Sequence, residues 1–217
     1  MKTKVLLADD HAIVREGLRM LLARESDMEV VGEAADGRAA VELAKKLSPD
    51  IVIMDVAMPG LIGIEATRQI LAASRSVKVV ALSMHSDKRF VSEMLKAGAS
   101  GYLLKDSVAQ EVASAIRTVL SGKTYLSPAV TGVVVDEYVK RRPGKDSSGF
   151  SVLSAKEREV LQLIAEGRTT KEIAAKIKVS VKTVEAHRQH IMEKLDIHSV
   201  AELTKYAVRE GLTSLDK

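Results

Sequence analysis

The sequence predicts a doubly wound α/β domain with a five-stranded parallel sheet, followed by a small all-α domain of four helices. Three observations lead to this fold class. Up to about residue 120, short apolar runs alternate five times with amphipathic stretches; a stretch containing Pro, Gly and Ser follows; and residues 151–217 show only helical patterns. Apolar runs that alternate with helices are typical of a parallel sheet covered on both faces.

The five apolar runs are the predicted strands. They are rich in Val, Ile and Leu and cover residues 4–8, 29–33, 51–54, 77–82 and 101–104. In a doubly wound fold, reactive groups lie in the crevice beyond the carboxyl ends of the strands. Polar side chains occupy these positions after four of the five runs: Asp9, Asp10, Asp55, Ser83 and Lys105.

The three carboxylates predict a site for a hard cation. Asp9, Asp10 and Asp55 would repel one another at neighbouring strand ends unless positive charge lay between them. Mg²⁺ suits this donor set, because it prefers oxygen ligands and keeps waters that a phosphoryl oxygen can replace. A carboxylate can also act as a nucleophile and form an acyl phosphate. We read His11 and His85 as bystanders, because Mg²⁺ prefers oxygen to nitrogen.

The segment after the α/β pattern predicts a connector. Ser127 followed by Pro128 indicates the start of a short helix that runs to about Val139, since serine caps helices and proline favours the first helical position. Residues 141–149 then have the Pro, Gly and Ser content of a flexible linker. The domain boundary is expected there.

Four helices are predicted in residues 151–217. The pairs Ser154 with Glu157 and Thr169 with Glu172 each match a capping box, in which each residue satisfies a backbone donor of the other. The remaining signals are Gly167 as the end of the first helix, Ser180 as the cap of a third helix that runs to about Leu195, and Ser199 as the cap of a fourth that runs to about Arg209. A short second helix joined by a tight turn to the third is the arrangement of a helix-turn-helix.

Composition excludes several classes of protein. The chain has no cysteine, which excludes disulfides and zinc sites of the finger type. It has no apolar stretch of the roughly 18 residues that a membrane helix needs, so we expect no membrane association and a cytoplasmic location. The net charge of +4 arises entirely after residue 120, which only weakly favours a nucleic acid partner.

The strand-end residues resemble the signature of response-regulator receiver domains. The matching segments are Asp9-Asp10-His11, residues 55–60 with Gly63, Ser83, and residues 101–105. The resemblance implies a flavodoxin-like receiver in which Asp55 is phosphorylated, with Mg²⁺ bound by Asp9, Asp10, Asp55 and the backbone carbonyl of Ala57. It further implies that Ser83, Tyr102 and Lys105 contact the phosphoryl group or switch with it. Ile62 departs from the family pattern, which usually has Asn or Asp there, and this leaves the start of the next helix uncertain.

Residues 153–212 resemble the DNA-binding domain of the NarL/FixJ, or LuxR-type, regulators. The resemblance rests on residues 153–161, Glu166-Gly167, residues 171–174, Lys182 to Val184, and Lys194-Leu195. At about 100° per residue, Val184, Ile191 and Leu195 fall on the inward side of the third helix. The predicted DNA contacts are phosphate contacts by Thr170, Lys171, Lys182, Thr183 and Arg188, and base contacts by Glu185, Ala186 and Gln189.

Together the two resemblances imply a phosphorylation-dependent transcription regulator. The expected domains are a receiver at 1–121, a linker with a short helix at 122–150, and a LuxR-type domain at 151–217. Its expected partners are a sensor histidine kinase, double-stranded DNA, and a second copy of the chain when phosphorylated. Its only expected chemistry is phosphoryl acceptance and slow self-dephosphorylation. The resemblance further implies that the unphosphorylated receiver masks the third helix of the DNA-binding domain.

Two alternatives stay open on the residues alone. An aspartyl-phosphate hydrolase or phosphotransferase is one, although such enzymes commonly have a second carboxylate two residues after the nucleophile, where this chain has Ala57. A receiver joined to an RNA-binding or protein-binding domain is the other. RNA readers usually stack bases on aromatic side chains, and residues 151–217 contain only Tyr206, which favours duplex DNA.

Overall fold

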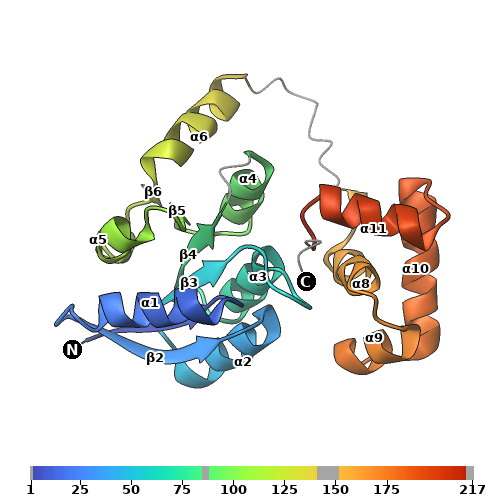
Figure 1. Ribbon diagram of the computed structural model, residues 1–217, viewed down its shortest axis with the longest axis horizontal. Helices are drawn as coiled ribbons and strands as arrows, with labels where there is room; N and C mark the ends of the chain where they lie inside the picture. The colour runs from blue at the N-terminus through green and yellow to red at the C-terminus, as the bar shows by residue number, and fades with distance from the viewer. Residues whose placement is uncertain (1, 85–87, 141–151, 214–217) are drawn as a thin grey trace. The chain divides into compact units, whose positions relative to one another are not determined.

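The computed structural model of the chain describes residues 2–84, 88–140 and 152–213 (Figure 1). The described residues form two compact units, the first containing most of residues 2–140 and the second containing residues 152–213. The flexible connector expected at 141–149, and His85, lie outside the described residues.

The first unit is built on a parallel sheet in the strand order β2-β1-β3-β4-β5-β6. Its strands are β1 (Thr3–Ala8), β2 (Met28–Ala34), β3 (Ile51–Asp55), β4 (Lys78–Ser83), β5 (Gly101–Leu104) and β6 (Tyr125–Leu126). The five predicted strands are all confirmed. The continuous apolar runs of β1, β3, β4 and β5 produce strands that are buried along most of their length, as in β3, where all five residues are buried. In β2 only Met28 and Ala34, at its two ends, are buried.

The prediction of five strands was one too few. Tyr125 and Leu126 form β6, which pairs in parallel with Gly101 and Tyr102 of β5. A two-residue strand is too short to show an apolar pattern in the sequence. It forms because the edge of β5 offers free backbone groups: the Ser127 N–H donates to the carbonyl of Tyr102 at 2.9 Å.

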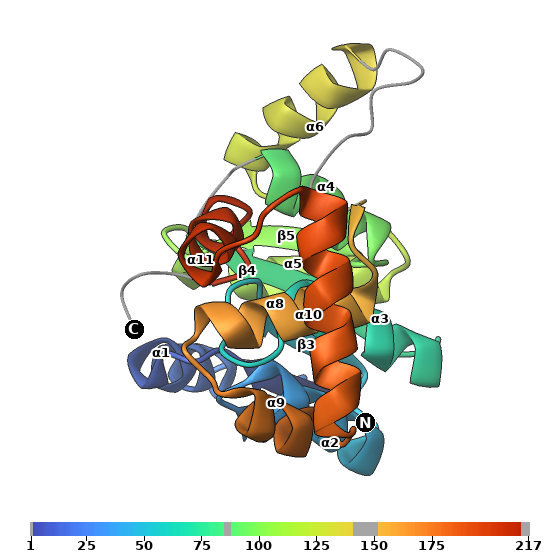
Figure 2. The ribbon, with the colours of Figure 1, turned by 90° about the vertical axis from the view of Figure 1, so that its right-hand side faces the viewer.

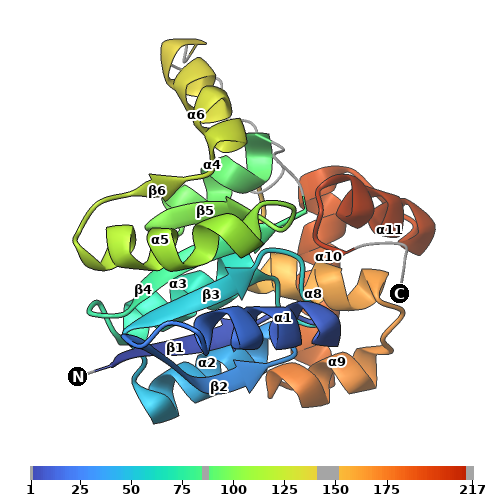
Figure 3. The same ribbon diagram turned by 60° about the vertical axis from the view of Figure 1, so that its left-hand side comes forward.

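Helices cover both faces of the sheet, which confirms the doubly wound fold. Figure 3 shows α1 (Ala12–Leu22) and α5 (Val108–Leu120) together on one face. The opposite face is covered by α2 (Gly37–Leu47), α3 (Gly63–Ala73) and α4 (Lys88–Lys96), with α2 against α3 and α3 against α4.

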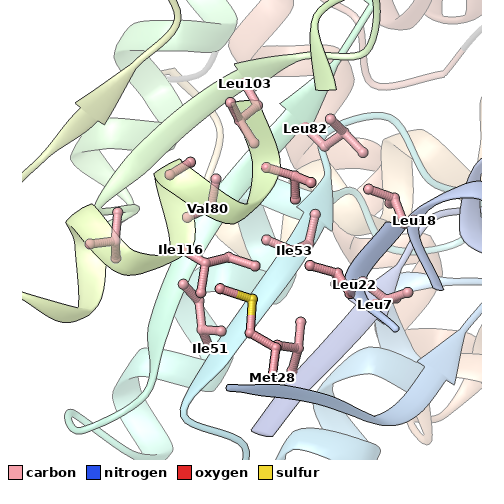
Figure 4. Close-up of a cluster of buried hydrophobic side chains, with 14 residues drawn as sticks. Leu7, Leu18, Leu22, Met28, Ile51, Ile53, Val80, Leu82, Leu103 and Ile116 are labelled. Carbon is pink, nitrogen blue, oxygen red and sulfur yellow. The ribbon is translucent and has the colours of Figure 1, made fainter. Parts of the chain in front are cut away.

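The core under α1 and α5 is a continuous apolar cluster (Figure 4). Leu18 and Leu22 of α1 and Ile116 of α5 meet the strand residues Ile53 and Leu82 there, and each is at most 2% exposed. Full burial of one such side chain stabilises the fold by about 1.5–3 kcal/mol. This packing fixes the sheet, and with it the positions of the residues at the strand ends.

Helix α6 (Pro128–Lys140) begins where Ser127 and Pro128 predicted a helix. Its start is tied to the rest of the unit by Glu111 of α5, whose Oε2 accepts hydrogen bonds from Ser127 Oγ at 2.6 Å and Tyr125 Oη at 3.1 Å. Ser127 Oγ in turn accepts from the N–H of Leu104, the last residue of β5, at 3.3 Å. The first part of the expected linker is therefore attached to the sheet.

The second unit contains the four predicted helices (Figure 2): α8 (Ala155–Ala165), α9 (Thr170–Ile177), α10 (Val181–Leu195) and α11 (Val200–Arg209). Both predicted capping boxes are present, at Ser154 with Glu157 and at Thr169 with Glu172. Gly167, at φ 77°, follows the end of α8, as predicted. Helix α8 packs against α10 and α11, while α9 packs against α10.

Glu157 joins two helices of this unit. Its Oε2 accepts a hydrogen bond from the N–H of Ser154 at 2.7 Å and one from Lys194 Nζ of α10, also at 2.7 Å. Burial alone would raise the pKa of Glu157, but the hydrogen bonds from Lys194 and Ser154 outweigh it and lower that pKa to about 2. The carboxylate therefore stays charged and holds α8 to α10.

Among the helices in the described ranges, none combines the length and the apolar character that crossing a bilayer requires.

Candidate functional site

Three strand ends bring the predicted acidic residues and the predicted lysine into one pocket. Asp9 and Asp10 follow β1, Asp55 ends β3, and Lys105 follows β5. The Nζ atom of Lys105 lies 2.7 Å from Asp9 Oδ2 and 2.8 Å from Asp55 Oδ2. These residues lie in different parts of the sequence, and the parallel sheet places them side by side. Their predicted convergence is confirmed.

The pocket concentrates negative charge away from water. Asp9 is 1% exposed and Asp55 is 2% exposed. Burial raises the pKa of Asp55 to about 6, and the charge of Asp9 adds to the rise, while Lys105 and the Ala57 N–H lower it in part. Burial alone would lower the pKa of Lys105, but Asp55 and Asp9 outweigh it and raise that pKa. One lysine thus faces two buried carboxylates, and the balance of charge in the pocket is negative.

The donor set fits a hard divalent cation. One ligand atom each from Asp9, Asp10, His11 and Asp55 can be chosen so that all four atoms lie within 4.8 Å of one another. Three of these four residues offer carboxylate oxygens, which Mg²⁺ prefers. Burial is the main cause of the raised pKa of Asp55, and repulsion from Asp9 adds to it, so further positive charge in the pocket would favour the charged form of Asp55.

The backbone after β3 presents Asp55 to the pocket. The N–H of Ala57 donates to Asp55 Oδ1 at 3.2 Å, and the N–H of Gly63 donates to the carbonyl of Val56 at 2.9 Å. A Cβ atom at position 63 would lie 1.9 Å from the backbone oxygen of Asp55. Only glycine allows α3, which begins at Gly63, to start this close to the strand, and Ile62 does not disturb that start.

Ser83 and Tyr102 lie on β4 and β5. Ser83 is 4% exposed, and its carbonyl accepts a hydrogen bond from the N–H of Lys105 at 2.8 Å. Tyr102 is fully buried. Ser83 is thus attached to the residue that contacts Asp55. The change of rotamer expected for Tyr102 on phosphorylation stays a prediction.

Two residues that the sequence analysis did not place in the site, His11 and Arg15, contact Asp9 or Asp10. His11, read as a bystander, lies with its Nδ1 2.9 Å from Asp10 Oδ1 and 3.2 Å from Asp9 Oδ1. Arg15, which the sequence analysis did not single out, donates from Nη1 to the carbonyl of Asp9 at 2.6 Å. The only feature of the sequence that could have indicated this contact is that Arg15 falls in the first turn of the helix after Asp10.

The helix-turn-helix consists of α9 and α10. Lys178, in the left-handed conformation at φ 56°, turns the chain between them, and Ser180 caps α10 by accepting from the N–H of Thr183. Val184 and Ile191 of α10 are buried, as predicted. The opposite side of α10 is exposed, and it presents Lys182, Glu185, Ala186 and Gln189.

The other predicted DNA contacts lie on α9 and α10. Lys171 is exposed at the start of α9, whereas Thr170, Thr183 and Arg188 are partly exposed. Gln189 Nε2 donates to Glu193 Oε1 at 2.9 Å within α10. The amide of Gln189 therefore lies on the surface that the helical pattern predicted.

Comparison with known protein families assigns a family to each unit. Residues 5–117 match the family described as "Response regulator receiver domain". Residues 151–207 match the family described as "Bacterial regulatory proteins, luxR family".

Individual relatives cover nearly the whole chain. The oxygen regulatory protein NreC of Staphylococcus carnosus is 44% identical over 214 residues, which is 96% of this chain and 98% of NreC. A structure of the RcsB response regulator of Salmonella typhimurium matches with a TM-score of 0.59 and 30% identity, over 96% of this chain and 98% of that chain. A structure of two RcsB dimers bound to two parallel DNAs matches with a TM-score of 0.59 and 30% identity, over 95% and 98% of the two chains.

Proposed function

The chain belongs to the response regulators that join a receiver domain to a LuxR-type regulatory domain, and from this premise we propose that Asp55 accepts the phosphoryl group that controls its binding to DNA. Members of this family are phosphorylation-dependent transcription regulators and not enzymes that act on metabolites. The partner on the input side is a sensor histidine kinase. The observation that supports Asp55 as the acceptor is its buried carboxylate, 2.8 Å from Lys105 Nζ.

In the proposed reaction, an oxygen of Asp55 attacks the phosphorus of a phosphohistidine. The new P–O bond forms as the P–N bond breaks, and the imidazole leaves. Lys105, already beside Asp55 and Asp9, stabilises the charge on the transferred group. Ser83 donates its hydroxyl to a phosphoryl oxygen, and Tyr102 changes rotamer with it. Asp9, Asp10, Asp55 and the carbonyl of Ala57 would hold a Mg²⁺ ion, which would supply the remaining positive charge. Slow hydrolysis of the phosphoaspartate resets the protein.

For the output side we propose a reading surface on α9 and α10. The exposed face of α10 enters the major groove, where Glu185, Ala186 and Gln189 contact base edges. Phosphate contacts fix the register of the helix, and they come from Thr170, Lys171, Lys182, Thr183 and Arg188. Because RcsB is bound to DNA as dimers, we propose that this chain also binds as a homodimer once it is phosphorylated, and that it acts in the cytoplasm.

We propose domain boundaries of 1–121 for the receiver, 122–150 for a linker with a short helix, and 151–217 for the DNA-binding domain. The family matches at 5–117 and 151–207 support both outer domains. The part of the linker that forms β6 and α6 packs on the receiver.

Labelling with a small-molecule phosphodonor tests the acceptor. The intact mass of the full chain, measured with Mg²⁺ and phosphodonor, should increase by one phosphoryl group, and Asp55→Asn should abolish the increase. Asp106→Asn is the matched control, because Asp106 is an exposed carboxylate next to Lys105. Labelling of Asp55→Asn to the wild-type extent would show that another residue is the acceptor. Enrichment of genomic DNA fragments by the full chain, with and without phosphodonor, tests the output.

A further inference from the structure

Asp9 is held by contacts to its side chain and to both of its backbone polar groups. Its side chain accepts from the N–H of His11 at 2.8 Å through Oδ1, and Oδ2 lies 2.7 Å from Lys105 Nζ. Its backbone N–H donates to the carbonyl of Ala34 at the end of β2, at 3.1 Å. Its own carbonyl is the acceptor for Arg15, at 2.6 Å.

The contact of Arg15 with this carbonyl fixes the direction of two carboxylates. The carbonyl belongs to the peptide unit between Asp9 and Asp10, which is planar. Holding its oxygen therefore sets the dihedral ψ of Asp9 and restricts φ of Asp10. These two angles set the directions of the Cα–Cβ bonds of Asp9 and Asp10 relative to each other, so a group that touches neither carboxylate affects the orientation of both.

Arg15 is itself anchored, as a positioning group must be. It lies on α1, with its side chain 17% exposed, and its Nε is 3.4 Å from Glu33 Oε2 on β2. Helix α1 and strand β2 are both packed in the core of the receiver unit. The guanidinium thus connects two rigid elements to the loop between β1 and α1.

We propose that Arg15, supported by Glu33, is a positioning residue for the metal site: it holds the Asp9–Asp10 peptide so that the two carboxylates face the cation together. The inference rests on the proposed function, because it assumes a divalent cation bound by Asp9 and Asp10. The contacts of Arg15 are with the carbonyl of Asp9 and with Glu33. Loss of a group that orients metal ligands typically weakens metal binding about 10- to 100-fold.

Binding of Mn²⁺ alone to the full chain tests this role. Mn²⁺ accepts the same oxygen ligands as Mg²⁺, and the free ion is counted from its electron paramagnetic resonance signal during a titration. We expect Arg15→Ala to raise the Kd for Mn²⁺ about tenfold. Glu33→Gln keeps the arginine but weakens its anchor, and it should raise the Kd by a smaller factor.

The sign of the effect separates positioning from simple electrostatics. Arg19→Ala is the matched control, because Arg19 is on the same helix and also approaches Glu33, at 3.8 Å, but pairs mainly with Glu16. Removing a positive charge near an acidic site strengthens cation binding through space. Electrostatics alone therefore predicts tighter Mn²⁺ binding for both arginine variants, whereas positioning predicts weaker binding for Arg15→Ala only.

The thermal unfolding temperature of each variant shows whether it is folded. If Arg15→Ala does not fold, Arg15→Gln decides, because it also removes the positive charge, and a Kd at or below the wild-type value in that folded variant overturns the inference. Unchanged or tighter binding by a folded Arg15→Ala also overturns it. A wild-type chain that binds no Mn²⁺ would overturn the metal site of the proposed function and this inference with it. If the wild type binds Mn²⁺ and Arg15→Ala binds it equally well, only the role of Arg15 is overturned.

Discussion

The buried carboxylate of Asp55 should contribute a cost to the stability of the receiver at neutral pH that is absent in acid. Its pKa rises from 3.8 to about 6 in the folded chain. Since each tenfold change in proton affinity corresponds to about 1.4 kcal/mol, the deprotonated group costs the fold about 3 kcal/mol. An acid whose pKa is raised on folding binds its proton more tightly in the folded state, so stability decreases as the pH rises from about 4 to about 6, and the cost is complete above that range.

Asp55→Asn removes this cost while it keeps the shape of the side chain. The variant should be more stable than the wild type by up to about 3 kcal/mol at neutral pH, which is about 10 °C in the unfolding temperature of a domain of this size. The difference should shrink as the pH falls and approach zero below about pH 3, where Asp55 is protonated in both the folded and the unfolded chain. Added Mg²⁺ should stabilise the wild type and leave the variant almost unchanged.

Differential scanning calorimetry of both full-length chains in a chelating buffer, at several pH values, measures the difference directly. Asp106→Asn is the control for removing a carboxylate, because Asp106 is exposed. If Asp55→Asn were less stable than the wild type at neutral pH, or differed from it equally at all pH values, the attribution of the raised pKa to burial and to Asp9 would be wrong.

Three further predictions follow from single contacts. Gly63→Ala should destabilise the receiver by about 3 kcal/mol and slow its phosphorylation, since the added Cβ would lie 1.9 Å from the oxygen of Asp55; urea unfolding that matches the wild type would contradict this. Glu157→Ala should cost about 1–2 kcal/mol at neutral pH. Because the pKa of Glu157 is lowered to about 2, this contribution is present above its ordinary pKa of 4.5 and is lost as the pH falls towards 2, which circular dichroism can follow. Lys182→Ala should weaken binding to all DNA sequences and reduce the salt slope by about 1, whereas Gln189→Ala should relax the preference at one base pair; equal effects of both changes on specific and random DNA would refute the division.

The acidic pocket could be predicted from the sequence because it depends on topology more than on detail. Once five apolar runs are taken as parallel strands, their carboxyl ends must meet at one edge, and Asp9, Asp55 and Lys105 follow such ends. The helix caps of the second unit could be predicted for a similar reason. A capping box such as that of Thr169 and Glu172 is a contact between residues three apart, and it needs no knowledge of the rest of the fold.

Contacts between distant segments could not be predicted in the same way. Strand β6 exists because β5 has a free edge, and nothing in Tyr125 and Leu126 themselves indicates a strand. Arg15 looks like any charged residue on a surface helix until β2 places Glu33 beside it. Gly63 was recognised as part of a motif, but the reason for a glycine appears only when α3 is seen to start against the backbone of Asp55.

The sequence by itself determined the two kinds of fold, the approximate ends of five strands, several helix ends in the second unit, and the residues that meet at the acidic pocket. Apolar periodicity and helix caps act over a few residues, so they can be read along the chain. Only the tertiary structure decided how deeply Asp55 is buried, which partners its charge has, and which side chains orient the loop around Asp9. Those properties depend on distances between segments far apart in the chain, and packing alone sets these distances.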